Sequence, residues 1–234
     1  ASGIGEAMVR AFAAQGSHVG FVDLDEGRGG ALAQELTAAG ATARFAPCDL
    51  RDIEALRGAF AALKAALGPV GVLVNNAARD DRHAWADVTP AYYDERMATN
   101  LRHMFFAIQA VAPDMITANK GSIINFGSNS WLETFAGLPV YATAKSAVHG
   151  MTRSFARELG KHRIRVNTIV PGWVMTERQK TLWAKPEALA RHLERQCLPV
   201  PIDPVYVANM ALFLASDDAA MCTANNYMVE AGSI

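Results

Sequence analysis

The sequence predicts an α/β fold in which helices cover both faces of a parallel sheet. The 234 residues, 51% of them hydrophobic, suffice for one large core. Short apolar segments such as VGVLV (70–74) and IRVNTIV (164–170) alternate along the chain with helical patterns. Strands that are buried on both faces read as continuous apolar runs, so this alternation favours a parallel sheet between two helical layers.

The elements of the first half are bounded by typical capping residues. Gly16 ends the first helical pattern, Asp52 precedes another as an N-cap, and Gly68-Pro69 stops it. The expected helices span residues 5–15, 28–39 and 52–67, and the expected strands span 18–23, 42–46 and 70–74.

The second half continues the alternation. Thr89 and Pro90 have the residue types of an N-cap and a first helical position, and the helix that follows runs to about Asn119 with a bend expected at Pro113. Further helices are expected at 140–160 and 204–215, and strands at 122–126, 164–170 and 227–229. Right-handed crossovers then give a three-layer, doubly wound Rossmann fold with a central parallel sheet, in one domain spanning residues 1–234.

The start of the chain departs from this pattern. Ala1-Ser-Gly-Ile-Gly5 stands directly before a helix, whereas a glycine-rich turn of this kind normally follows a strand. We therefore expect the first strand, at the centre of the sheet, to be absent from this sequence and to precede it in the natural protein.

Composition excludes several classes of partner. The net charge is −1 without blocks of like charge, which indicates no nucleic-acid or anionic-membrane partner, and no apolar run is long enough to cross a bilayer. The three cysteines (Cys48, Cys197, Cys222) are scattered and lack CxxC spacing. This usage predicts a cytoplasmic protein without a disulfide framework, and the histidine spacing predicts no metal site.

Glycine and aspartate positions suggest a dinucleotide site. Gly3 and Gly5 allow the backbone to approach a pyrophosphate at a helix N-terminus, although they also suit an ordinary glycine-rich start of a helix. Asp23 ends the second expected strand about 20 residues later, where a carboxylate can hold both ribose hydroxyls of NAD and repel a 2′-phosphate. No Arg or Lys stands at 1–5 or 22–27, so NAD is favoured over NADP. Asp49 and Asn75-Asn76 could contact adenosine, or simply form a cap and a turn.

Tyr141 and Lys145 could form a proton-abstracting pair. They are four residues apart and share one helix face. A lysine ammonium lowers the pKa of a neighbouring phenol, which otherwise titrates near pH ~10. Ser128, directly after a buried strand, could face the same pocket, and the three together suit removal of a proton from an alcohol. Alone, the YxxxK spacing could also occur on a helix by chance.

Taken together, these motifs resemble the short-chain dehydrogenase/reductase family along the whole chain. The TGxxxGIG turn of that family corresponds to Gly3-Ile4-Gly5, and its NNAG motif to Asn75–Ala78, with alanine in place of the final glycine. The resemblance implies catalytic roles for Asn100, Ser128, Tyr141 and Lys145, with 12 residues between Ser128 and Tyr141 as is usual in the family. It also maps a PG motif onto Pro171-Gly172 and a nicotinamide contact onto Thr176.

By this resemblance, Tyr141 accepts the hydroxyl proton while hydride leaves for the nicotinamide. Lys145 lowers the tyrosine pKa and bonds the nicotinamide ribose, Ser128 holds the substrate oxygen, and Asn100 fixes a water that relays the proton. The expected cofactor contacts are Ser2, Gly3, Ile4, Asp23, Asp49, Leu50, Asn76, Ala77, Ala78, Tyr141, Lys145, Pro171, Gly172, Val174 and Thr176. Such proteins are usually dimers or tetramers, and the apolar residues on several faces of helices 89–119 and 140–160 are consistent with a partner subunit.

The segments that should border the substrate are 80–83, 129–131 and 173–179. They carry polar side chains and two tryptophans, which suit a sugar better than a fatty chain or steroid. Segments such as RDDRH and NFGSNSW are similar to those of bacterial aldose 1-dehydrogenases, which implies oxidation of an aldose at C1 to its lactone. The expected substrate contacts are Ser128, Asn129, Trp131, Tyr141, Trp173 and Gln179.

Alternatives remain at the sequence level. The same catalytic residues would serve a carbonyl reductase of 3-oxoacyl or steroid-like substrates, whose loop at 173–185 should be apolar, whereas TERQKTLWAK is polar. A non-catalytic NAD-binding regulator should lack Tyr141 or Lys145. Residues 176–197 could be a substrate-covering lid or two ordinary surface helices, at 176–184 and from 186.

Overall fold

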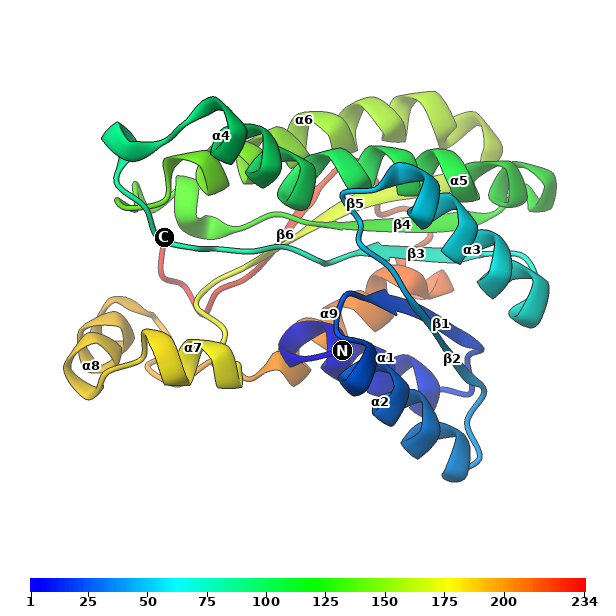
Figure 1. Cartoon of the computed structure of the whole chain (residues 1–234), viewed down its shortest axis with the longest axis horizontal. Helices are drawn as coiled ribbons and strands as arrows, with labels where there is room; N and C mark the ends of the chain where they lie inside the picture. The colour runs from blue at the N-terminus through cyan, green and yellow to red at the C-terminus, as the bar shows by residue number, and fades with distance from the viewer.

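The computed structural model describes all residues from 1 to 234, and its elements follow the predicted order (Figure 1). The helices are α1 (Gly3–Ala14), α2 (Glu26–Ala38), α3 (Ile53–Leu67), α4 (Pro90–Met97), α5 (His103–Ala118), α6 (Pro139–Leu159), α7 (Glu177–Leu182), α8 (Pro186–Arg195) and α9 (Pro204–Ala215). The strands are β1 (Val19–Asp23), β2 (Ala43–Pro47), β3 (Val72–Asn75), β4 (Gly121–Phe126), β5 (Ile164–Pro171) and β6 (Asn226–Val229). Apart from the long helix 89–119, the predicted elements are confirmed, with small shifts at their ends.

The predicted N-caps are confirmed. The Asp52 carboxylate accepts hydrogen bonds from the N–H groups of Glu54 and Ala55 at 3.0 and 3.1 Å. Thr89 Oγ1 accepts from the Tyr92 N–H at 3.2 Å, ahead of Pro90. These side chains satisfy donors that the first helical turn leaves unpaired, so each helix starts where its cap stands.

The long helix is interrupted at a different place from the one predicted. A π-helical turn, Ala98–Arg102, separates α4 from α5, while α5 is continuous through Pro113. In this turn the Asn100 amide nitrogen donates to the Arg96 carbonyl at 2.9 Å, and its oxygen accepts from the Arg79 N–H at 2.8 Å. The wider turn therefore brings Asn100 against the loop after β3, which a period of 3.6 residues would not indicate.

The strands form two parallel sheets instead of one continuous sheet. One has the order β1-β2 and the other the order β3-β4-β5-β6. In the larger sheet Ile123 pairs with Leu73 on one side and with Val166 on the other. No strand within residues 1–234 pairs with both β1 and β3, which agrees with the expectation that the central first strand is absent from this sequence.

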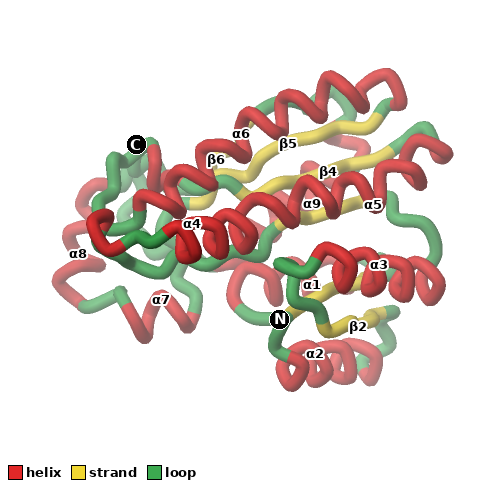
Figure 2. The backbone as a smooth tube through the Cα atoms, turned by 45° about the horizontal axis from the view of Figure 1, so that its top comes forward, coloured by secondary structure: helices red, strands yellow, loops and turns green.

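Helices cover the larger sheet on both faces (Figures 1 and 2). Ile123 and Ile124 are both fully buried but face opposite layers, as successive residues of a strand must. Ile123 belongs to a core cluster with residues of α3, α5 and α6, and Ile124 to one with residues of α1 and α9. This confirms the three-layer α/β arrangement.

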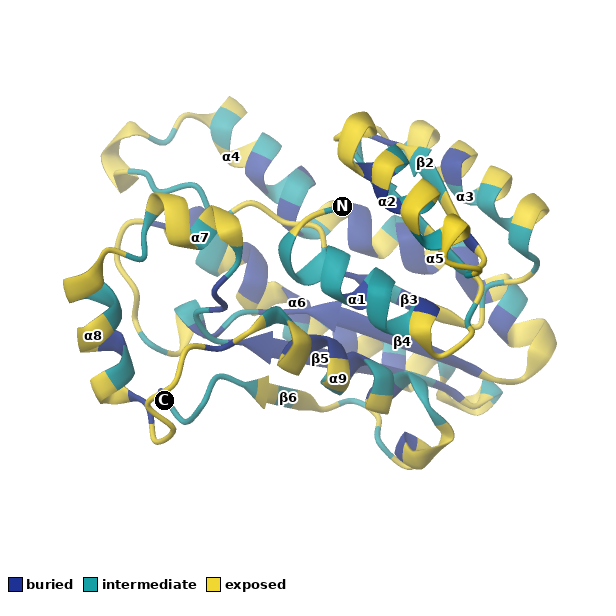
Figure 3. Cartoon of the chain, turned by 90° about the horizontal axis from the view of Figure 1, so that it is seen from below, coloured by how far each residue is buried: buried dark blue, intermediate teal, exposed yellow.

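Burial follows the same layers. Figure 3 shows β4 and β5 buried, whereas α7 and α8 stand apart from the sheet with much of their surface exposed. No helix is long and apolar enough to span a membrane. The carboxyl ends of the parallel strands share one edge, and in open α/β sheets ligands bind at that edge.

Candidate active site

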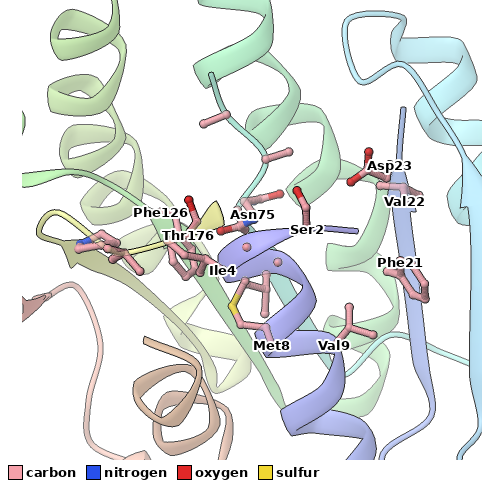
Figure 4. A pocket seen from close by; sticks show the side chains of 18 of the residues that line it. Ser2, Ile4, Met8, Val9, Phe21, Val22, Asp23, Asn75, Phe126 and Thr176 are labelled. Carbon is pink, nitrogen blue, oxygen red and sulfur yellow. The ribbon is translucent and has the colours of Figure 1, made fainter. Parts of the chain in front are cut away.

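A large cavity lies at the carboxyl ends of the strands and extends between the two sheets. Its volume, about 1990 Å³, includes the gap between β1 and β3 that no strand within residues 1–234 fills. Figure 4 shows one part of it, with Asp23 at the end of β1 and Ser2 at the start of α1. All the expected cofactor residues line this cavity, as do all the expected catalytic and substrate residues except Asn100 and Trp131.

The turn before α1 requires glycine at position 3. Gly3 has φ +54°, in the left-handed region, and an added Cβ would lie 2.8 Å from Thr176 Cγ2. Thr176, from the segment after β5, is therefore packed directly against this turn, as expected for two residues at one binding site (Figure 4). A side chain at position 3 would fill the cradle next to the helix N-terminus, where phosphate groups bind well.

Two aspartates at the ends of β1 and β2 differ in their partners. Burial acts to raise the pKa of Asp23, whereas backbone hydrogen bonds from Asp25, at 2.9 Å, and from Leu24 act to lower it, and the pKa lies below its usual value. Asp23 is thus ionised at neutral pH. The Asp49 carboxylate is bonded to Arg51 at 2.6 Å, which lowers its pKa. A contact from Asp49 to adenine would therefore compete with this ion pair.

Lys145, Tyr141 and Ser128 lie together on the cavity wall. Tyr141 and Lys145 are one turn apart on α6, and Lys145 Nζ is 5.8 Å from the Tyr141 ring centroid. Lys145 is almost fully buried and donates to the Phe126 carbonyl at 2.8 Å. Ser128, just beyond β4, donates to Ser130 Oγ at 3.1 Å. A parallel strand and the helix that follows it thus bring the three side chains to one place.

The pKa of Tyr141 is not lowered by Lys145 in this structure, contrary to the prediction. Burial of the phenol raises its pKa to about 12, although the neighbouring Ser128 hydroxyl opposes that shift. Burial also lowers the pKa of Lys145 to about 7, so near neutral pH only about half of the lysine side chains carry the charge that would stabilise a phenolate. The spacing of YxxxK was read correctly, but the energetic cost of burying both groups cannot be seen from spacing.

Asn100 and Trp131 are the two expected site residues that do not line the cavity. The Asn100 amide is buried and bonded at both ends to backbone groups, so its role in holding a water stays a prediction. The Trp131 indole N–H donates to His149 Nε2 at 3.2 Å and the ring is 37% exposed. The prediction that Trp131 lines the substrate pocket is therefore wrong, because its ring packs on α6 outside the cavity.

Trp173 and Gln179 instead form a polar wall. The Trp173 indole donates to Gln179 Oε1 at 2.9 Å, and Gln179 Nε2 donates to Asp80 at 2.7 Å. Asn129 also lines the cavity and donates to Ser233 Oγ at 3.2 Å. The bonds from Trp173 to Gln179 and from Gln179 to Asp80 connect α7 to the loop after β3, so both segments border the same part of the cavity.

Sequence reasoning did not foresee how two residues of the RDDRH loop act. His83 Nε2 accepts the Val140 N–H at 3.4 Å, while its Nδ1 contacts the Tyr92 hydroxyl at 3.0 Å. It thereby caps the start of α6, next to Tyr141. Arg82 stacks between Phe135 and Trp183. Their partners come from distant parts of the chain, and no local signal pairs them.

A parallel α/β fold with a serine, a tyrosine and a buried lysine at the carboxyl edge defines a class of oxidoreductase that acts on CH–OH groups. The chain belongs to the short-chain dehydrogenase/reductase family, and residues 1–233 match the family described as enoyl-(acyl carrier protein) reductase. It is 48% identical over 231 residues to the D-xylose 1-dehydrogenase of Caulobacter vibrioides, covering 99% of this chain and 91% of that protein. It is 47% identical to a probable galactose dehydrogenase of Rhizobium meliloti, with the same coverage of both chains.

Solved structures agree in fold. A 7α-hydroxysteroid dehydrogenase complexed with NADH and 7-oxo glycochenodeoxycholic acid superposes with a TM-score of 0.95 at 28% identity, covering 100% of this chain and 91% of that one. A putative gluconate dehydrogenase from Agrobacterium tumefaciens superposes with a TM-score of 0.94 at 27% identity, covering 99% and 92%. The predicted family and fold class are thus confirmed.

Proposed function

We propose that this protein oxidises an aldose at C1 to the corresponding lactone, with NAD as the hydride acceptor. The observation that carries the proposal is one cavity with two kinds of wall. Ser128, Tyr141 and Lys145 form one wall, and the bonded pair Trp173 and Gln179 belongs to the other. The xylose and galactose dehydrogenases at 48% and 47% identity support the same substrate class.

The residues present fit a nicotinamide dinucleotide. The glycine cradle at Gly3, which a Cβ would fill, suits a pyrophosphate at the start of α1. The ionised Asp23 suits a ribose with two free hydroxyls and disfavours a 2′-phosphate, which supports NAD over NADP. Around these, the cofactor would be held by Ser2, Ile4, Asp49, Leu50, Asn76, Ala77, Ala78, Pro171, Gly172, Val174 and Thr176.

The protein supplies the base and the orientation of the substrate. Ser128 donates to the oxygen of the reacting hydroxyl once its bond to Ser130 exchanges, and Tyr141 takes the proton from that hydroxyl. A bound NAD would supply the hydride acceptor, and the positive charge of its oxidised nicotinamide would favour the phenolate against the burial that raises the Tyr141 pKa. Lys145 faces the same region and would hold the ribose.

We also propose that residues 1–234 act as one NAD-binding domain with a lid at 176–197. Arg178 pairs with Asp81 at 2.8 Å, and Gln179 bonds Asp80, so α7 is fastened to the loop after β3. Arg178, Gln179 and Asp80 all line the cavity, and the contacts between them are polar. Such a segment can open by exchanging polar contacts for water.

Self-association is a further part of the proposal. Among the apolar residues of the predicted helices 89–119 and 140–160, Met104 and Val148 are fully buried within the chain and so do not face a partner. Phe105 is 46% exposed and lies against Phe155 on the outer face of α5 and α6. This aromatic surface supports a homo-oligomer, a dimer or tetramer, which light scattering after size-exclusion chromatography would detect. A cytoplasmic location stays a prediction.

The test is a panel of pentoses and hexoses with NAD and, in parallel, NADP. NADH absorbance should rise with at least one aldose, and the hydroxamate reaction should detect the lactone. A carbonyl reductase would instead consume NADH with 3-oxoacyl thioesters or oxosteroids and leave every aldose untouched. That second result would refute the aldose assignment. If the wild-type protein, which has Tyr141, turns over none of these substrates, a non-catalytic NAD-binding role is favoured.

A further inference from the structure

Arg82 lies on the cavity wall without a polar partner. It lines the same cavity as Ser128 and Tyr141. Its guanidinium carbon lies 4.8 Å from the Phe135 ring centroid and 5.1 Å from the Trp183 ring centroid. Its Nε is buried without a hydrogen-bond partner, and so is the Trp183 indole nitrogen beside it. Contact with the two rings holds the guanidinium in place without using its hydrogen-bond donors.

The nearest carboxylates in the chain do not pair with Arg82. Asp80 accepts from Gln179 at 2.7 Å. Asp81 is bonded to Arg96 at 2.6 Å and to Arg178 at 2.8 Å. Both carboxylates are thus bonded to Gln179, Arg96 and Arg178. Neither of them takes up the hydrogen-bond donors of Arg82, which remain available to a ligand. The two Nη groups of Arg82 are not among its buried atoms and have no partner in the chain, so they are the donors that a ligand in the cavity can reach.

We propose that Arg82 determines substrate specificity by donating paired hydrogen bonds to two neighbouring hydroxyl oxygens of the sugar, on the side of the ring remote from C1. This rests on the proposed aldose oxidation, because Ser128 and Tyr141 then hold the C1 oxygen. The planar guanidinium fork matches two adjacent oxygens, whereas a lysine would offer only a point charge.

The charge of the surroundings favours neutral hydroxyls over a carboxylate. Asp80 and Arg82 both act on the Tyr141 phenol, with opposite signs, so a negative and a positive group face the same space. A hydroxyl can donate to the one and accept from the other. A sugar acid would gain from Arg82 but would meet repulsion from Asp80.

The experiment compares wild type, Arg82→Met and Arg82→Lys. Methionine keeps an apolar chain between the rings, and lysine keeps the charge without the fork. We expect Arg82→Met to raise KM for the aldose by about 10- to 100-fold while kcat changes by less than about threefold, with Arg82→Lys intermediate. KM for NAD should stay unchanged. Arg57→Met is the matched control, because Arg57 also stacks on a ring, Phe106, but lies outside the cavity.

A second measurement locates the contact on the sugar. Deoxy analogues lacking one remote hydroxyl should lose kcat/KM with wild type but lose much less with Arg82→Met. If removing the hydroxyl and replacing Arg82 lower kcat/KM independently, so that their free-energy costs add, the two groups do not interact. That result would overturn the inference and leave the proposed aldose oxidation standing.

A binding measurement tests the inference independently of whether the protein oxidises an aldose. Tryptophan emission, to which Trp183 contributes, is titrated with xylose and with glucuronate in the NAD-loaded protein. Weaker xylose binding by Arg82→Met supports the inference even if no aldose is oxidised. Equal binding by both proteins, no binding by either, or tighter binding of glucuronate than of xylose contradicts it.

Discussion

Replacement of Lys145 by methionine should stabilise the cofactor-free protein at neutral pH. Burial lowers the pKa of this lysine from 10.5 to about 7 in the folded state. Because the folded value lies below the unfolded value, the wild type loses stability as the pH falls from the upper value to the lower one, and loses no more below it. At about pH 8, protonation of this amine favours the unfolded chain over the folded one by roughly 3 kcal/mol. At about pH 10 the same difference is less than about 1 kcal/mol.

The difference between the two pH values isolates this effect. Methionine leaves the Phe126 carbonyl without its 2.8 Å partner, a cost of about 1–3 kcal/mol that does not vary with pH. The stability of Lys145→Met relative to wild type should therefore fall by about 2 kcal/mol from about pH 8 to about pH 10.

Urea unfolding of both proteins at the two pH values measures this change, and turnover of the variant should be lost. Lys161→Met, at an exposed lysine, is the control and should show a much smaller change. A relative stability of Lys145→Met that stays constant between the two pH values would refute the reasoning. A buried lysine that lowers the stability of the protein in this way indicates that the side chain serves the function and not the fold.

Three further variants, with Gly30→Ala as a control, test the base, the cofactor carboxylate and the glycine turn. Tyr141→Phe should lower kcat by about 10³-fold, because the proton acceptor is lost, while NAD binding measured by fluorescence stays intact; turnover near the wild-type rate would exclude Tyr141 as the base. Asp23→Ala should lower the ratio of kcat/KM with NAD to that with NADP by roughly tenfold, since a like charge near the 2′-phosphate is removed, and an unchanged ratio would contradict the role. Gly3→Ala should cost about 1–2 kcal/mol and weaken NAD binding, because φ is +54° and the Cβ would meet Thr176. Gly30→Ala, whose Cβ meets nothing within 4 Å, should instead stabilise the protein by about 0.5–1 kcal/mol. Equal effects of the two glycine changes in thermal melts would contradict the cradle.

Local patterns predicted most of the fold, because the relevant physics acts over a few residues. Asp52, Thr89 and Pro90 start helices where they were expected to, since a cap acts within one turn. Continuous apolar runs such as Ser122–Phe126 predicted a strand buried on both faces, which β4 is. The π turn at Asn100 was missed, because it depends on bonds to Arg79 and Arg96 and not on the helical period.

The sequence by itself determined the order of the elements and the family, and it predicted which residues are catalytic, because turn chemistry and motif spacing are local. Only the tertiary structure decided what surrounds those residues. It turned Trp131 out of the cavity, brought Trp183 and Phe135 onto Arg82, and placed Tyr141 partly and Lys145 almost fully out of solvent, which moves both pKa values against the expected catalysis. The physical reason is that burial and stacking arise from segments far apart in the chain, and a local pattern carries no information on which of them meet.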